Sequence, residues 1–292
     1  GKRSSRRKRW ASILLAGAKM FEAVSVLFRA SYQEPLWGKY CSHLRNSIDA
    51  VCIFFIGYAF EHQGRSPSYP PAAVKAIKKS EDNHDSPQDI WKNFGNSLRN
   101  KGLNKDINPL YHDDNSCNTK EMCIWCALGS KNIVSASKED LNKDQIKAAH
   151  DRLKRIRGVG NKIASLFLRD VAVNYNLTPI KDRWLLQPVD IWIRRIVQSL
   201  NNSSEMDNRA IAEWIVDRCK ECNINPERCN QGMWYFAARI AGSDFELEQS
   251  LQDMNYARNL LKNHISVLKT SSSAAIELES QLNNWLFAEL CG

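Results

Sequence analysis

The sequence contains 292 residues, a length typical of one or two domains and sufficient to bury a core without disulfides or metals. Hydrophobic residues make up 43% of the chain and charged residues 25%, a composition that excludes wholesale disorder and a fibrous repeat. The 41 Lys and Arg residues outnumber the 32 Asp and Glu residues, and the net charge of +9 makes a polyanion a candidate partner. Part of the excess lies in a basic tail over residues 1–9, which either is simply solvated or contacts phosphates.

Two apolar stretches near the N-terminus predict helices over residues 12–30 and 40–60. Neither predicts a membrane span, because the most apolar run, residues 50–60, is too short to cross a bilayer and Lys19 and Glu22 interrupt the first stretch. No small-residue cleavage pattern follows the basic tail. We therefore expect an intracellular protein, in the cytoplasm, the nucleoid or the nucleus, without a membrane partner.

The rest of the chain alternates breaks with helical patterns. Residues 63–71 are rich in Pro, Ser and Gly, and residues 102–119 are polar and aperiodic, so both predict loops. Helical patterns fill three later ranges, residues 137–200, 246–268 and 274–290. The sequence holds neither a repeat of fixed period nor an alternating pattern long enough for a sheet. We therefore predict an all-α fold.

Nine cysteines, an odd number, argue against a secreted disulfide framework. Six of them form two groups that each contain one C-x-x-C spacing: Cys117, Cys123 and Cys126, and Cys219, Cys222 and Cys229. A C-x-x-C pair lets two thiolates reach one zinc ion, but neither group supplies four ligands. Since cysteine is also a common core residue, zinc binding and simple packing both stay open.

The stretch from Leu153 to Ser165 carries the most information about function. Its two glycines, Gly158 and Gly160, bracket one apolar residue between two helical patterns. Glycine is favoured where the chain turns with positive φ, or where no side chain can stand between the backbone and a ligand. Such a turn directs the free N–H groups of the following helix toward an anion, for which a DNA phosphate is a natural candidate. The alternative is a packing corner between two helices that binds nothing.

Two further segments lie downstream of this turn. Pro188 and Val189 precede Asp190 at a predicted helix start, where the carboxylate serves at least as an N-cap. Residues 230–240 open another apolar helix.

Taken together, the turn, the Pro-Val-Asp segment and the later helix resemble the helix-hairpin-helix superfamily of DNA base-excision glycosylases over about residues 138–243. The resemblance implies two helical subdomains with the DNA site in the cleft between them. We expect residues 136–243 to form the hairpin subdomain, and residues 10–135 together with 244–292 to form the other.

The resemblance also implies roles for individual residues. Lys162 falls where bifunctional members place the amine that attacks the deoxyribose C1′, and Asp190 falls where the family places its catalytic aspartate. Partial burial and nearby cations would help to keep the amine unprotonated. The implied DNA-binding residues are Arg157, Gly158, Val159, Gly160, Asn161 and Arg194. The resemblance thus predicts a glycosylase that forms a Schiff base through Lys162 and has abasic-site lyase activity.

Two departures from the family pattern bear on substrate and cofactor. The gap between Lys162 and Asp190 contains an apparent insertion, residues 174–186, and this spacing is most similar to the archaeal 8-oxoguanine glycosylase branch. Members with an iron–sulfur cluster hold four cysteines after the helix that matches residues 230–240, whereas this chain has only Cys291 there. We expect no such cluster, although zinc or a monovalent cation bound at the hairpin stays open.

The base pocket is the least defined part of the site. A flipped base requires aromatic walls and a few polar groups. The candidates are Trp91, Trp125, Trp184, Trp192, Trp234, Asn230 and Gln231, and core packing is the default for most of the tryptophans. An 8-oxoguanine-like base is favoured, and alkylated, deaminated or phage-type modified cytosine substrates stay open. The other hypotheses are a monofunctional glycosylase and a non-catalytic DNA-binding module, and in each case we expect a monomer on duplex DNA.

Overall fold

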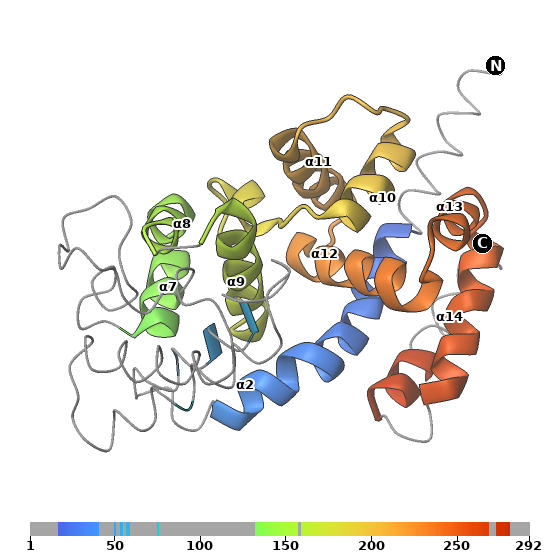
Figure 1. The fold of residues 1–292 in the computed structure, drawn as a ribbon, viewed down its shortest axis with the longest axis horizontal. Helices are drawn as coiled ribbons and strands as arrows, with labels where there is room; N and C mark the ends of the chain where they lie inside the picture. The colour runs from blue at the N-terminus through green and yellow to red at the C-terminus, as the bar shows by residue number, and fades with distance from the viewer. Residues whose placement is uncertain are drawn as a thin grey trace, which may run out of the picture. The chain divides into compact units, whose positions relative to one another are not determined.

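The computed structural model describes residues 17–40, 50, 53–54, 57–58, 75, 132–156, 159–268 and 273–280. The regular secondary structure within those ranges is helical and includes no strand, which agrees with the predicted all-α class (Figure 1). No helix among the described residues is both long enough and apolar enough to cross a membrane. The basic tail, the predicted loops over residues 63–71 and 102–119, and most of the predicted helix over residues 40–60 lie outside the described residues.

The chain divides into two compact units. Unit 1 comprises Gly1–Gln33 and Val189–Gly292, and unit 2 comprises Glu34–Pro188. The boundaries therefore fall after residues 33 and 188, whereas the sequence suggested 135 and 243. The physical reason is packing: the first described helix contributes to the core that contains residues 193–237, and the helix after the glycine turn packs on aromatic residues from positions 37–58.

Unit 2 contains α2 (Glu34–Tyr40), α7 (Ile133–Asn142), α8 (Ile146–Lys154), α9 (Asn161–Asn174) and the short 3-10 helix η4 (Arg183–Leu186). Helix α9 is the most buried of these helices, and its Phe167 is completely buried. The ring of Phe167 stacks on Trp37, with centroids 6.1 Å apart, and meets Phe54 and Tyr58 edge-on at 5.3 and 5.2 Å. These contacts fix α9 in the centre of its unit.

A polar cluster lies within this aromatic core. The Tyr58 hydroxyl donates to Asp170 Oδ2 at 2.7 Å and accepts from Trp37 Nε1 at 3.1 Å. Arg169 Nε donates to the other carboxylate oxygen of Asp170 at 2.8 Å. Burial, together with the charge of Asp170, raises the pKa of Tyr58 well above its ordinary value, so the phenol stays a donor.

The segment after α9, which the sequence marked as an insertion, is held against the turn between α7 and α8. Asp144 Oδ1 accepts from the backbone N–H groups of Ile180 and Lys181 at 2.7 and 3.0 Å. The chain then forms η4, which packs on α8 and α9 before leaving the unit.

Unit 1 begins with a helix over residues 17–28 that continues as the π-helix η1 (Arg29–Gln33). Its other elements are α10 (Ile191–Asn201), α11 (Asn208–Glu221), α12 (Pro226–Tyr235), the π-helix η5 (Phe236–Ala241), α13 (Asp244–Gln252), α14 (Met254–Leu268) and a helix over residues 273–280 (Figure 1). The core brings together segments that are far apart in the sequence, since Val24 and Leu27 of the first helix pack in one cluster with Ile193, Ile196 and residues of α14.

One glycine makes this packing possible. A Cβ atom added to Gly232 of α12 would lie 1.6 Å from the backbone oxygen of Phe21 and 2.5 Å from its carbonyl carbon. The first helix therefore crosses α12 at backbone contact, and no larger residue fits at position 232 without moving a helix.

Two predicted helix boundaries were wrong. The predicted helix over residues 246–268 is two helices, because Asp253 leaves the helical conformation and its carboxylate accepts from Asn255 N at 2.9 Å, at the start of α14. Helix α7 begins before Ser137, because Asn132 caps it by accepting from Val134 N and Ser135 N.

Candidate active site

The residues of the predicted hairpin fall in α8, in the connection that follows it and in α9. Of the turn, Arg157 and Gly158 lie outside the described residues. Val159 is buried, and its N–H donates to the carbonyl oxygen of Ile156 at 3.0 Å. The apolar residue between the two glycines thus anchors the turn in unit 2.

Gly160 is the N-cap residue of α9, and no side chain caps this helix. Its backbone angles, φ −97° and ψ −172°, are extended and suit any residue, and a Cβ atom added there would meet no atom within 4 Å. Neither backbone conformation nor packing within the described residues therefore requires glycine here. What glycine does provide is open access to the first N–H groups of α9, which have no partner inside the helix.

Lys162 is the second residue of α9 and is exposed. Its ammonium group makes no hydrogen bond or ion pair with any described residue. The expectation of partial burial is therefore wrong for the protein without DNA, because the side chain leaves the helix at an open end. Lys154 and Arg155, at the end of α8, are also exposed, so cations flank the turn on both sides.

A buried histidine lies behind the turn. His150 of α8 is 3% exposed, and its Nε2 lies 3.3 Å from Ser165 Oγ of α9. Burial lowers the pKa of His150, and a hydrogen bond with the backbone of Asn161 opposes that shift in part. This residue was missed at the level of sequence, because a lone histidine in an amphipathic helix carries no pattern.

Asp190 is the N-cap of α10 and is half-buried. Its Oδ1 accepts from Ile193 N at 2.9 Å, while Oδ2 makes no hydrogen bond to the described part of the chain. The capping role read from the sequence is therefore present, and it leaves one carboxylate oxygen for other contacts. Asp190 belongs to unit 1, whereas Lys162 belongs to unit 2.

The side chain of Arg194, one turn further along α10, already makes hydrogen bonds within unit 1. Its guanidinium donates to Met206 O at 2.7 Å and also to the side chain of Asn208. These bonds brace the connection between α10 and α11. The contact with DNA suggested for Arg194 would have to compete with them.

The base-pocket candidates are mostly packing residues. The Trp234 ring meets Phe28 and Tyr32 edge-on at 5.8 and 5.4 Å, and Trp192 packs against the core of unit 1. Gln231 is fully buried and its Nε2 donates to Gln33 Oε1 at 3.1 Å, so the suggestion that it reads a base edge is not supported.

The remaining candidates add little to a pocket. Asn230 is likewise fully buried, and Trp184 is half-buried in η4 of unit 2. Trp91 and Trp125 lie outside the described residues.

The second cysteine group lies in and against the core of unit 1. Cys219 and Cys229 are buried and Cys222 is half-buried, and all three are free thiols. A hydrogen bond with Cys219, together with burial, raises the pKa of Cys229 well above its ordinary value, which opposes thiolate formation. Among the described residues no three His, Cys, Asp or Glu side chains are arranged to hold a metal ion. The first group, Cys117, Cys123 and Cys126, lies outside the described residues.

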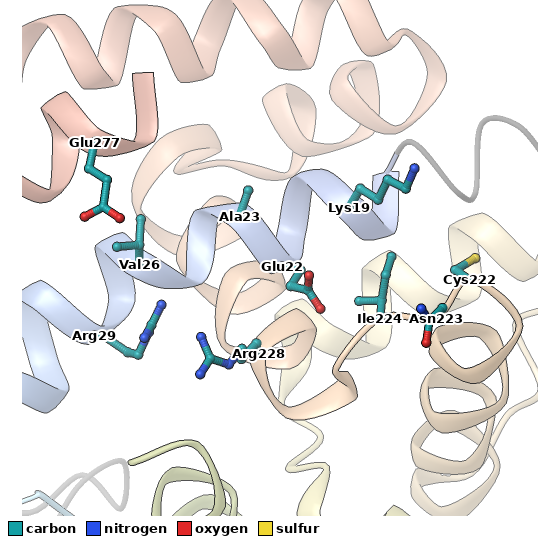
Figure 2. A pocket seen from close by; sticks show the side chains of 10 residues that line it. All are labelled: Lys19, Glu22, Ala23, Val26, Arg29, Cys222, Asn223, Ile224, Arg228 and Glu277. Carbon is teal, nitrogen blue, oxygen red and sulfur yellow. The ribbon is translucent and has the colours of Figure 1, made fainter. Parts of the chain in front are cut away.

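Unit 1 also contains a cavity of about 810 Å³ that the sequence did not indicate. Figure 2 shows its lining, which comes from the first helix and η1, from the α11–α12 connection, from the start of α12 and from residue 277. Its charged residues are three cations and two carboxylates: Lys19, Arg29, Arg228, Glu22 and Glu277. Glu22 has a structural role, since its Oε2 accepts from Asn225 N at 2.6 Å. Because these residues come from three segments that are far apart in the sequence, no local motif could have shown them.

Comparison with known proteins finds a distant relative. The chain is 24% identical, over an alignment of 291 positions, to a protein of Methanocaldococcus jannaschii that is itself uncharacterized; the alignment covers 78% of this chain and 67% of the other. No protein-family model matches the chain, and no solved structure matches it.

Proposed function

We propose that this chain is a DNA glycosylase with abasic-site lyase activity, which flips a damaged or modified base out of the duplex and excises it through a Schiff base on Lys162. The observation that supports this function best is the open first turn of α9. Gly160 leaves that turn without a side-chain cap, and Lys162 stands exposed within it. Free N–H groups at a helix start bind anions, and a DNA phosphate there would bring the backbone sugars near the amine.

The chemistry assigns one task to each of two residues. The unprotonated amine of Lys162 attacks C1′ of the flipped nucleotide, the N-glycosidic bond breaks, and the base leaves with the bonding electrons and takes up a proton. The sugar ring then opens to a Schiff base, from which loss of a C2′ proton expels the 3′-phosphate. The carboxylate of Asp190 would stabilise positive charge on the sugar, and its Oδ2 makes no hydrogen bond to the described residues.

The position of Lys162 also favours a second candidate. An exposed lysine that makes no hydrogen bond or ion pair with the described residues is what a simple phosphate contact requires. In that case the chain is a monofunctional glycosylase, or a DNA-binding module without base excision, in which Lys162 only holds the backbone.

Product analysis separates these functions. Duplexes that carry 8-oxoguanine, uracil, an alkylated purine or glucosylated hydroxymethylcytosine are incubated with the wild type, Lys162→Gln and Asp190→Asn. The proposal expects the wild type to release one base, 8-oxoguanine first among them, and to cleave the strand, and both variants to lose base release while still binding DNA. Base release that survives in Lys162→Gln would indicate the monofunctional enzyme. Binding without release from any duplex would indicate the DNA-binding module.

A further inference from the structure

We infer that the buried imidazole of His150 is a positioning group that holds the first turn of α9 in the orientation that DNA requires. This inference rests on the proposed function, because it assumes that the N–H groups of this turn and Lys162 meet the DNA backbone. His150 itself contacts no DNA in this account and acts through α9.

The contacts of His150 converge on one face of α9. Its ring lies 3.3 Å from the hydroxyl of Ser165 and forms a hydrogen bond with the backbone of Asn161. Residues four apart on a helix are neighbours on one face. The ring of His150 therefore contacts both ends of the first turn of α9, at Asn161 and at Ser165, from the side of α8. Lys162 is the residue next to Asn161, on the exposed side.

The first turn of α9 needs a hydrogen bond of this kind because it lacks the usual side-chain cap. A Ser, Thr, Asn or Asp at the N-cap normally binds the first N–H groups and fixes the start of a helix. Gly160 has no side chain to do this, and a cap would in any case block the N–H groups that a phosphate uses. A hydrogen bond from α8 fixes the turn from the buried side and leaves its open side free.

An apolar residue would fill the same space without this effect. The buried side chains of Ala149 and Leu153 already pack α8 against its neighbours, so packing alone does not require a histidine at position 150. A buried polar group costs free energy unless it is paired, whereas a paired one restricts how two helices fit together. The imidazole offers one donor and one acceptor when neutral, which matches its two partners.

Two measurements on His150→Leu and His150→Gln test the inference. The first is amide hydrogen exchange of the free protein. Ala164 N–H, which donates to Gly160 O at 3.1 Å, should exchange at least tenfold faster in His150→Leu, and His150→Gln should restore most of the protection because it keeps a donor and an acceptor. Unchanged protection in His150→Leu would overturn the inference whether or not the protein binds DNA.

The second measurement is the affinity for a duplex with a tetrahydrofuran abasic-site analogue. His150→Leu should bind at least about fivefold more weakly, and His150→Gln should recover most of the loss. The control is Tyr58→Phe, which breaks buried hydrogen bonds in the same unit at Asp170, eight residues beyond Lys162 on α9. Tyr58→Phe should lower stability and leave affinity unchanged. Equal losses of affinity in Tyr58→Phe and His150→Leu would assign His150 a merely structural role, while a wild type that does not bind the duplex would refute the proposed function instead.

Discussion

Replacing Gly160 by Ala separates the two reasons for which a glycine can stand at the start of α9. The extended backbone at Gly160 suits alanine, and the added Cβ atom would meet no atom within 4 Å. Alanine is the poorer N-cap, by about 0.5–1 kcal/mol, and it restricts the unfolded chain by a similar amount. We therefore expect the free energy of unfolding, measured by urea denaturation, to change by less than about 1 kcal/mol.

The effect on DNA binding should be much larger. If a phosphate lies against the first N–H groups of α9, the methyl group that Gly160→Ala adds occupies part of its place. A lost hydrogen bond to a charged group costs about 1.5–3 kcal/mol, which corresponds to a loss of about 10- to 150-fold in affinity. Fluorescence anisotropy with the abasic-analogue duplex measures this loss. The salt dependence of the affinity should stay the same, because the substitution removes no cation.

Gly38→Ala is the matched control. Gly38 lies in α2 of the same unit, and a Cβ atom there also meets no atom within 4 Å. This variant should bind DNA as the wild type does. A folded Gly160→Ala protein with wild-type affinity would refute the reasoning, because the glycine would then serve no ligand.

Three further predictions concern stability and its pH dependence. Gly232→Ala should lower the free energy of unfolding by about 3 kcal/mol, because its Cβ would lie 1.6 Å from the Phe21 backbone oxygen; urea denaturation measures the loss. Asp170→Asn should cost about 3 kcal/mol or more in the same assay, because Arg169 would keep its buried charge without the carboxylate. Burial lowers the pKa of His150, so its neutral form contributes stability that is present above the unfolded pKa of about 6.5 and is lost as the pH falls toward the folded pKa. Urea midpoints between pH 7.5 and 5 should therefore fall less steeply in His150→Gln than in the wild type.

Each of these predictions has a control. Gly17→Ala changes a glycine of the first helix whose Cβ meets no atom within 4 Å, and a loss as large as that of Gly232→Ala would contradict the close-approach argument. Asp151→Asn breaks the exposed ion pair with Lys147 and should cost far less than Asp170→Asn, so equal effects of the two substitutions would refute the importance of burial at Asp170. Parallel pH profiles in His150→Gln and the wild type would show that His150 titrates alike in both states.

Local signals in the sequence, the helical periodicity and the capping residues, predicted the all-α class and several helix starts. Asp190 was predicted at a helix start and is the N-cap of α10. Asn132 and Asp253 perform the same chemistry but were missed, because each lies near other polar residues or inside a helical pattern. A cap is visible in a sequence only as a candidate, and tertiary packing decides which candidate is used.

Contacts between distant residues could not be predicted from one sequence. The hydrogen bond between Tyr58 and Asp170 joins positions 112 residues apart, and Gly232 owes its identity to Phe21. The division into units depends on the same kind of contact, which is why the predicted boundaries differ from those of the structure.

The candidate site was predictable as a set of residue types rather than as an arrangement. The open turn at Gly160 follows directly from the glycine pattern. The exposure of Lys162 does not, because it depends on what surrounds the end of α9. His150 carried no sequence signal, since its contacts are with Ser165 and Asn161 of α9, which only the fold brings close to it.

Borohydride trapping is the most direct test of whether Lys162 forms a Schiff base with DNA. Borohydride reduces such an intermediate to a stable amine, so protein and strand migrate together on a denaturing gel. We predict an adduct between the wild type and a duplex that carries 8-oxoguanine or a bare abasic site, its absence in Lys162→Gln, and a weaker adduct in Asp190→Asn. No adduct on any duplex, although DNA binding is intact, would contradict the claim, and so would an adduct that Lys162→Gln retains.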